Sequence, residues 1–337
     1  MLAILGSLGA LTYLVPYQRS HHRQAEIKEI LANLKSLGSN PNYQSAVKLN
    51  IEFFRAVRNP FSFAWWLMVR APKLRKDRTK IVELLDLPFP KWQKSVLETL
   101  SWFEVWMRAL VPIKYYIIKE LDRLQGIKQE PIIVANFGCG GMELERQIIY
   151  ELLRRRFSFP LVLVGIDYSP ASFEVAASKF RNLESKGLVE IKAIPQLGSE
   201  TLRELKAGAV SRRPTVVLLH ANAFDLKELP KDSFDLVYHS RLRHHLTPSE
   251  GDKMDKLASH LAPKAVELDD IFSVLGVIII SIFVWRFPAV LNGAVLSYLR
   301  DFSRKELASK KEAGWNVVLT GKPLTSYLRA YHKISPP

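Results

Sequence analysis

Short apolar runs alternate with amphipathic segments in the part of the chain that follows residue 130. The apolar runs lie at 132–135, 161–166, 215–219, 234–238 and 265–268. The segments 144–155 and 172–183, which follow the first two runs, have the spacing of helices. Short strands separated by helices are typical of parallel β-α units. This pattern predicts an α/β domain over 131–337, and the segments 315–319 and 326–332 predict a closing β-hairpin.

The part before residue 131 has a helical pattern. Apolar and aromatic residues recur every three or four positions from Lys91 to Leu124, which predicts one or two amphipathic helices. The sequence contains no internal repeats and no low-complexity tracts. We therefore expect three parts: an apolar segment at 1–18, a helical accessory region at 19–130 and the α/β domain at 131–337.

The segment Met1–Gln18 contains no charged side chain. Its length approaches the ~20 apolar residues that span a bilayer, although Pro16 weakens that interpretation. A cleaved signal peptide is disfavoured because no positive residues precede the apolar stretch. Arg19 and Arg23 follow it, and positive flanks favour the cytoplasmic side. We expect a membrane-associated protein with its α/β domain on the cytoplasmic side; the alternative is a helix packed on the protein's own surface.

Composition and charge narrow the choice of partners. The chain has 337 residues with 48 Lys+Arg against 33 Asp+Glu, a net charge of +15. Residues 1–130 carry +9 of this, from 20 basic and 11 acidic side chains. A strongly basic protein suits nucleic acid or an anionic membrane surface. The single cysteine excludes a disulfide framework and a Cys-rich zinc site, and we expect no metal.

The basic charge is concentrated beside an aromatic run in Asn59–Lys80. Phe61, Phe63, Trp65 and Trp66 precede a cluster of six basic residues within 70–80. Tryptophans beside a basic cluster are typical of an interfacial membrane segment. The alternative is a core helix followed by a solvated basic loop. Nucleic acid is a weaker option, because the cluster is local rather than a stripe along the chain.

Candidate ligand-binding residues follow the first two strands of the α/β domain. Glycines at 138, 140 and 141 allow a tight turn and a close backbone approach to a ligand. The dinucleotide fingerprint fails, because its third glycine would fall on Glu143. Asp167 ends the second strand, 29 residues after Gly138. An acid there can accept both hydroxyls of a ribose, and its alternative role is to cap the next helix.

Four motifs in this order carry a resemblance to a known family. They are GCGG at 138–141, GIDYS at 165–169, NAF at 222–224 and SFDLVYHSRLRHHL at 233–246. From about 131 to 333 the chain resembles the class I S-adenosylmethionine-dependent methyltransferases, of the type that acts on small molecules. The resemblance implies a Rossmann-like fold with a seven-stranded methyltransferase sheet, here with an N-terminal helical region, and S-adenosyl-L-methionine as the cofactor.

The resemblance also implies a set of cofactor-binding residues. They are Asn136, Phe137, Gly138, Cys139, Gly140, Asp167, Tyr168, Asn222, Ala223, His239 and Ser240. The loop at 137–140 would hold the methionine end, Asp167 the ribose, and Tyr168 would lie near the adenine. Asn136 and Asn222 stand where the family usually has acids, and Met142 replaces its third glycine. An amide still accepts hydrogen bonds through its carbonyl, so we expect binding, but it lacks the charge of a carboxylate; weaker cofactor affinity or a non-catalytic descendant is the alternative.

The chemistry implied by the resemblance is an in-line displacement at a sulfonium methyl group. The enzyme chiefly aligns the nucleophile and excludes water, and a base is needed only if the acceptor arrives protonated. His239 and His244 are the candidate catalytic residues, because histidine titrates near neutral pH. Their alternative role is structural. Cys139 is expected to pack rather than to act as a nucleophile.

An apolar insertion follows the fifth strand, at about 270–300. Within it, 271–285 is fifteen residues without a charge, which is short of the ~18 that span a bilayer. We expect it to line an apolar acceptor pocket or to dip into the membrane; the alternative is a buried helix. Together these features predict methyl transfer to a hydrophobic small molecule, such as a lipid, quinone or polyketide, at a membrane surface and without a nucleic-acid partner. A non-catalytic binding or scaffold protein is the alternative.

Overall fold

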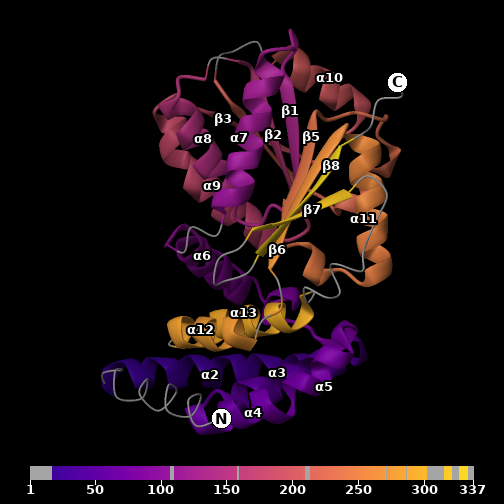
Figure 1. The fold of residues 1–337 in the computed structure, drawn as a ribbon. Coiled ribbons are helices and arrows are strands. Elements are labelled where there is room, and N and C mark those ends of the chain that lie inside the picture. Colours follow the sequence, from indigo (N-terminus) through magenta and orange to yellow (C-terminus); the bar gives the residue numbers. More distant parts are fainter. Residues whose placement is uncertain are drawn as a thin grey trace. The chain divides into compact units, whose positions relative to one another are not determined.

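A computed structural model describes residues 17–106, 110–157, 159–208, 213–270, 272, 274–285, 287–301, 315–320 and 326–332. The chain forms two compact units (Figure 1). The helical unit comprises the described residues of Met1–Val96 and Asp270–Leu307, and the sheet unit those of Leu97–Asp269, Ala308–Lys322 and Ser326–Pro337. The predicted anchor at 1–18 lies outside the described residues except for its last two positions.

The sheet unit is built on an eight-stranded sheet with the order β3-β4-β2-β1-β5-β6-β8-β7. Its strands are β1 Ile132–Phe137, β2 Leu161–Asp167, β3 Glu190–Ile194, β4 Thr215–His220, β5 Leu236–Ser240, β6 Lys264–Asp270, β7 Trp315–Thr320 and β8 Ser326–His332. The pairs among β1 to β6 are parallel, and β7 pairs with β8 in antiparallel fashion. The predicted parallel sheet and closing hairpin are confirmed, with β3 added at one edge.

Helices cover both faces of this sheet. They are α7 Val111–Gln125, α8 Glu143–Arg154, α9 Pro170–Ser185, α10 Ser199–Gly208 and α11 Pro248–Leu261. Alternate residues of β1 point to opposite faces: Ile132 and Val134 pack with α7, α8 and α9, whereas Ile133 and Ala135 pack with α10 and α11. Figure 1 shows these two helical layers on either side of the strands.

The sheet unit begins earlier in the chain than the expected boundary at 131. Two helices precede β1, α6 Pro90–Trp106 and α7, as the helical spacing predicted. Ile113, Ile117 and Leu121 of α7 are fully buried in the core that also contains Ile132. Because this apolar face is buried against the sheet, α7 and the second half of α6 belong to the sheet unit, which starts at Leu97.

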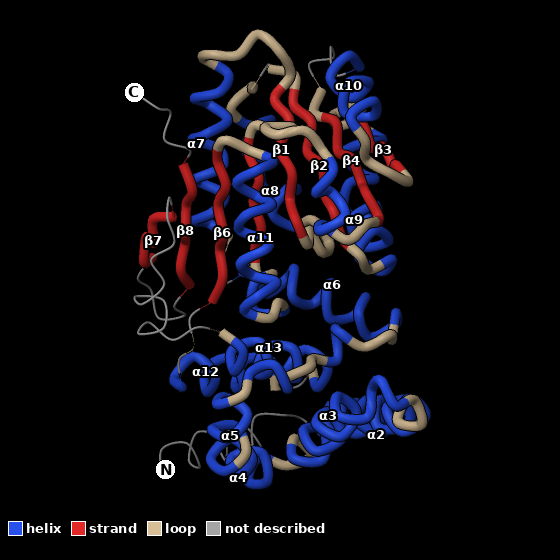
Figure 2. The backbone as a smooth tube through the Cα atoms, turned by 90° about the vertical axis from the view of Figure 1, so that its right-hand side faces the viewer, coloured by secondary structure: helices blue, strands red, loops and turns tan. Residues whose placement is uncertain are grey.

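The helical unit combines two distant segments of the chain. Its helices are α2 Tyr17–Leu37, α3 Gln44–Ala56, α4 Pro60–Val69, α5 Ala71–Lys76, α12 Val274–Val284 and α13 Pro288–Arg300, with short 3-10 turns η1 Pro41–Tyr43, η2 Arg78–Lys80 and η3 Leu84–Asp86. The helix α13 packs against α2, α3 and α5 as well as α12 (Figure 2). The basic segment after α4 is therefore mostly helical rather than a loop.

The insertion at 270–300 is a buried helical pair within this unit. Nearly every residue of α13 is buried. The Asn292 side chain donates to Asn50 Oδ1 (2.9 Å) and accepts from the Leu84 amide (2.7 Å), and Arg300 pairs with Asp86 (2.7 Å). The structure therefore favours the buried-helix alternative for α13. No helix within the described ranges combines the length and the apolar character that crossing a bilayer requires.

Candidate functional site

The strand order locates the point where the sheet unit reverses direction, before any side chain is considered. From β1 the chain builds β2, β3 and β4 to one side, and then returns to add β5 and β6 on the other side of β1. Ligands of open α/β sheets bind outside the carboxyl ends of the strands at such a reversal. The segments that follow β1 and β5 border this point, so the site is built from the residues after Phe137 and after Ser240.

The loop after β1 is bent by glycines in the left-handed region. Gly138 and Gly140 have φ values of 65° and 50°. A Cβ on Gly138 would come within 2.8 Å of the Leu242 side chain, so this position accepts no larger residue without movement. The amides of Gly138 and Cys139 donate to the carbonyl of Ile166 (2.8 and 3.1 Å). The loop therefore curls over the carboxyl end of β2, as the glycine motif predicted.

Asp167, at the end of β2, is bonded to this loop. Its Oδ2 accepts from the Gly140 amide and its Oδ1 from the Ser169 amide, both at 2.8 Å. The side chain is buried, and burial raises the pKa of its carboxyl while the two amide bonds lower it. The Ser172 hydroxyl is a third donor to this carboxylate, and because a carboxylate has about four lone-pair sites, one further donor can be accepted. Asp167 thus joins the glycine loop to the start of α9, and retains acceptor capacity for a ligand.

A buried polar group that the sequence analysis missed lies behind the loop. Glu145 of α8 is 1% exposed; its Oε1 accepts from the Tyr238 hydroxyl (2.6 Å) and from the Asn136 amide. Burial raises the pKa of Glu145, and both bonds lower it. Asn136 Oδ1 and Glu145 Oε2 have no hydrogen-bond partner among the described residues. The signal was available, because Glu145 falls on the same helical stripe as buried Ile148, Ile149 and Leu152.

The predicted residues after β2 and β4 lie at the same end of the strands. Tyr168 is 61% exposed, and its carbonyl oxygen lies 2.9 Å from His220 Nε2. Asn222 is exposed and caps the turn η4 Ala223–Glu228, where its Oδ1 accepts from the Phe224 amide (3.1 Å). Ala223 is buried. The structure therefore brings Tyr168 and Asn222 to the solvent-facing border of this reversal point.

His239, on β5, is enclosed by the protein. Its ring is 1% exposed, and neither nitrogen has a hydrogen-bond partner within the described part of the chain. Its Nε2 lies 3.7 Å from Glu267 Oε2. Burial lowers the pKa of His239, while Glu267 opposes that change. A neutral, enclosed imidazole can fill space but cannot contact an acceptor without movement of its surroundings. The neighbouring Ser240 hydroxyl is also buried, with no partner in the same described ranges.

An ion network surrounds His239. Arg329 of β8 donates to both oxygens of Asp255 (3.0 and 3.1 Å) and to Glu267, and Arg243 pairs with Asp255 (2.7 Å). His239, Asp255 and Glu267 place potential ligand atoms within 4.8 Å of one another, which is the spacing of a metal site. Two guanidinium groups already neutralise these two carboxylates, however. The cluster therefore fastens β8 to α11 and β6, and we assign it no metal.

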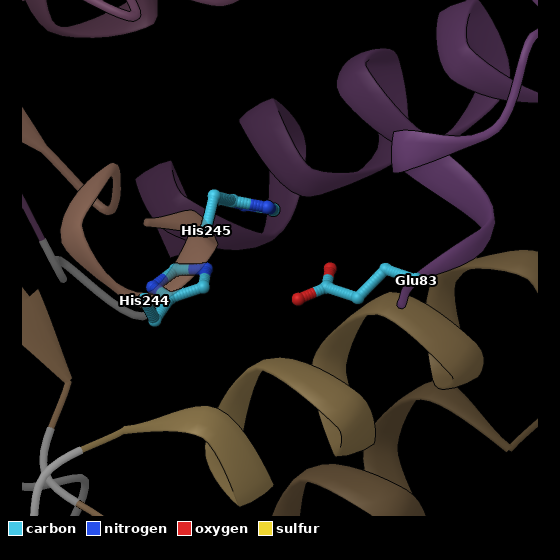
Figure 3. Close-up of side chains that lie close together, drawn as sticks. All are labelled: Glu83, His244 and His245. Carbon is cyan, nitrogen blue, oxygen red and sulfur yellow. The ribbon is translucent and has the colours of Figure 1, made fainter. Parts of the chain in front are cut away.

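His244 has a defined hydrogen-bond partner, the carboxylate of Asp269. Its Nδ1 lies 2.7 Å from Asp269 Oδ1, and its amide donates to Asp269 Oδ2 (3.1 Å). Both side chains are buried, and Asp269 lies at the carboxyl end of β6. His245 follows on the same turn, η5 Arg243–His245, with its ring centroid 4.3 Å from that of His244 (Figure 3). A carboxylate only accepts hydrogen bonds, so Nδ1 of His244 carries the proton and Nε2 is the basic nitrogen.

No family model and no curated protein matches the sequence. The plantazolicin methyltransferase BamL, in complex with a triazolic analogue and SAH, is 12% identical with a TM-score of 0.48, over 80% of this chain and 100% of that one. The plantazolicin methyltransferase BpumL with SAH is 10% identical with a TM-score of 0.46, over 80% and 99%.

The small RNA methyltransferase HEN1 is 12% identical with a TM-score of 0.37, over 65% of this chain and 26% of that one. All three TM-scores are below 0.5, so the fold of this chain rests on its own strand order and connections. These consist of a parallel sheet that reverses direction at β1 and ends in an antiparallel hairpin, with a glycine loop after β1 and an acid after β2. The chain has the Rossmann-like parallel sheet with a closing antiparallel hairpin that its motifs predicted, with one added edge strand.

Proposed function

We propose that this protein transfers a methyl group from S-adenosyl-L-methionine to a hydrophobic acceptor presented at a membrane surface. One observation carries the proposal: the glycine loop after β1 and the acid after β2 are bonded to each other at the reversal point of the sheet. Gly140 donates to Asp167 there, at 2.8 Å. The same place in the fold is where a nucleoside with a charged tail would find both a close backbone and a ribose acceptor.

The residues present fit this cofactor. Asp167 keeps acceptor capacity for a ribose hydroxyl, and the loop at 137–140 offers a backbone that no Cβ obstructs at Gly138. Asn136 Oδ1 and Glu145 Oε2 are buried acceptors without a partner among the described residues. Buried acceptors are rarely left unsatisfied, and the ammonium group of a methionine would supply the missing donors. Tyr168 and Asn222 complete the set at the adenine side.

His244 is the base in this proposal, and Asp269 is the residue that positions it. The bound cofactor supplies an electrophilic methyl group. Asp269 accepts a hydrogen bond from Nδ1–H of His244, which orients the ring, and in the proposal Nε2 takes the proton of an acceptor hydroxyl or amine as its heteroatom is methylated. His239 is not given this role, because neither of its ring nitrogens has a hydrogen-bond partner among the described residues that would orient it and fix its tautomer. The carboxylate also stabilises the imidazolium that forms when Nε2 is protonated.

Two features favour a hydrophobic acceptor. The insertion at 271–285 contains no charged residue, and the helical unit exposes large apolar side chains on α4. A lipid, quinone or polyketide would suit such surroundings better than a small polar molecule, which needs several fixed polar groups. RNA is included in the screen for methyl acceptors, because the net charge of +15 also suits a nucleic-acid partner.

Calorimetric titration with S-adenosylmethionine and S-adenosylhomocysteine tests the cofactor. We expect both to bind, and Asp167→Ala to weaken binding at least tenfold, about 1.4 kcal/mol. Asp122→Ala is the matched control, because Asp122 is an exposed acid on α7. Membrane lipid extracts and RNA are then screened with radiolabelled cofactor. If neither nucleoside binds, the non-catalytic scaffold, motivated by Asn136, Met142 and Asn222, replaces the enzyme.

A further inference from the structure

The helices α4 and α5 form one continuous helical path with a single buried side. Arg70, between them, has right-handed helical backbone, and the Leu74 amide donates to the Arg70 carbonyl at 3.1 Å, four residues back. Buried positions recur along this path at 60, 63, 64, 66, 71 and 74. Because this is the spacing of one helical face, the positions between them form a second face that points outward.

The buried side is held by aromatic contacts within the helical unit. The ring of Phe63 lies 5.9 Å from that of Phe53 and 5.4 Å from that of Trp285, and Trp66 meets Phe53 edge to face at 5.2 Å. Phe53 and Phe63 are fully buried. These contacts fix the orientation of α4, so its outward face stays on the surface of the helical unit.

The outward face is apolar over α4. Phe61 is 64% exposed, Trp65 65%, Met68 37% and Val69 39%. They follow one another at intervals of four, three and one residue, which places them on one stripe. Soluble monomers scatter single apolar residues over their surfaces, but a contiguous aromatic stripe is the mark of an interaction site. No acidic residue occurs between Pro60 and Lys76.

The charge beside this stripe divides into inward arginines and outward lysines. Arg75 donates to the Leu299 carbonyl (3.2 Å) and Arg78 to the Arg300 carbonyl (3.1 Å), so both belong to the packing of the helical unit. Lys73 and Lys76 are exposed, and they continue the outward positions of the α4 stripe. Exposed aromatic rings followed directly by exposed lysines match the two layers of an anionic lipid surface.

We infer that Phe61, Trp65, Met68 and Val69, together with Lys73 and Lys76, dock the protein on an anionic lipid surface. The rings and Met68 enter the headgroup boundary, and the lysines bind the lipid phosphates and carboxylates. The inference deepens the membrane part of the proposed function, but it rests on the helical unit alone. Vesicle binding needs neither cofactor nor acceptor, so its failure and the failure of methyl transfer are separate results.

Vesicle co-sedimentation of the full chain tests the lysines. We expect binding to vesicles of equal parts phosphatidylcholine and phosphatidylserine, and little binding to phosphatidylcholine alone. Lys73→Glu with Lys76→Glu should weaken binding at least tenfold, since each cation near the surface contributes roughly fivefold. Lys253→Glu with Lys256→Glu is the matched control, because these exposed lysines on α11 have the same spacing. Equal loss in both pairs, or equal binding to neutral vesicles, overturns the inference.

A fluorescent probe tests whether the rings enter the lipid. The only cysteine of the chain, Cys139, is buried, so an environment-sensitive dye can be placed at Trp65→Cys. We expect a blue shift of its emission with anionic vesicles, and none at Tyr115→Cys, which replaces an equally exposed side chain (64%) on α7. No shift at position 65 overturns the inference, even if the protein sediments with vesicles. Circular dichroism confirms that each variant is folded.

Discussion

Two buried histidines five residues apart occupy opposite kinds of environment. His239 lies inside β5, with no hydrogen bond to its ring among the described residues and a charge-balanced network around it. His244 lies just after the strand, and Asp269 fixes its Nδ1. The first arrangement disfavours the protonated ring, because burial lowers the pKa of His239, and the second fixes the orientation of the ring. Proximity to a motif therefore does not define a catalytic histidine; the partner of each nitrogen does.

The largest expected effect is a loss of stability when the ion network around His239 is broken. Arg329→Met removes the cation that joins Asp255 and Glu267, and should lower the free energy of unfolding by about 3–5 kcal/mol, because the buried Glu267 loses its close cation and Asp255 keeps only Arg243. Urea denaturation measures the loss. Adding Glu267→Gln to Arg329→Met should recover part of it, since one uncompensated charge is then removed. A loss below about 1 kcal/mol would show that the network is not structural.

The next largest effect is on the rate of methyl transfer, which should distinguish His244 from His239. With an acceptor identified by the screen, His244→Ala should lower kcat at least ~100-fold, and His239→Gln should leave it within about threefold. Asp269→Asn should also lower kcat, because an amide no longer specifies the Nδ1-protonated tautomer. Calorimetry with S-adenosylhomocysteine is the control, and all three variants should bind it like the unmodified protein. Equal losses for His239 and His244 would contradict the comparison.

The smallest effect is a pH dependence that belongs to His239. Burial lowers its pKa in the folded state from the usual 6.5. Above about pH 6.5 both the folded and the unfolded states are neutral at this ring, and the pH has no effect through it. Below that pH the unfolded state takes up the proton first, so stability falls as the pH falls, by at most about 1.4 kcal/mol per pH unit.

This slope is measured as a difference between two proteins. The free energy of unfolding of the unmodified chain should fall relative to that of His239→Gln between about pH 6.5 and pH 5. Subtraction removes the other titrating groups, including Glu145 and Asp167, whose raised pKa values act in the opposite direction. Parallel pH curves for the two proteins would mean that His239 takes up its proton as readily when folded as when unfolded.

The strands that were predicted correctly from the sequence are those that are buried on both faces. The strands β1, β2, β4, β5 and β6 carry continuous apolar runs because helices cover both of their faces. The strand β3 was missed for the converse reason. It lies at the sheet edge, is mostly half-buried, and its sequence Glu190–Ile194 mixes charged and apolar residues. A half-covered strand leaves a weaker pattern.

The candidate site was predicted only as far as local motifs reach. The glycine loop and Asp167 follow from the turn and the strand end on which they lie. The pairing of His244 with Asp269 does not, because the two residues are 25 positions apart and meet only when β5 pairs with β6. The role of Arg329 could not be predicted for the same reason, because this residue meets Asp255 and Glu267 only in the folded chain. Sequence motifs therefore locate the loop that would hold the ligand. The residues that determine which nitrogen carries a proton are distant in the sequence and meet only in the folded chain.

The split composition of the helical unit has a consequence for the order in which the protein is made. Asn50 of α3 receives its hydrogen bond from Asn292, 242 residues later in the chain. At about 5–20 residues per second of synthesis, the first helices wait roughly 12–50 s for that partner. The stretch Leu97–Asp269 emerges in the interval and is contiguous within the sheet unit. The ribosome therefore delivers most of the sheet before the helical unit that begins the chain can close, and during that delay the unpaired N-terminal helices are a natural substrate for chaperones.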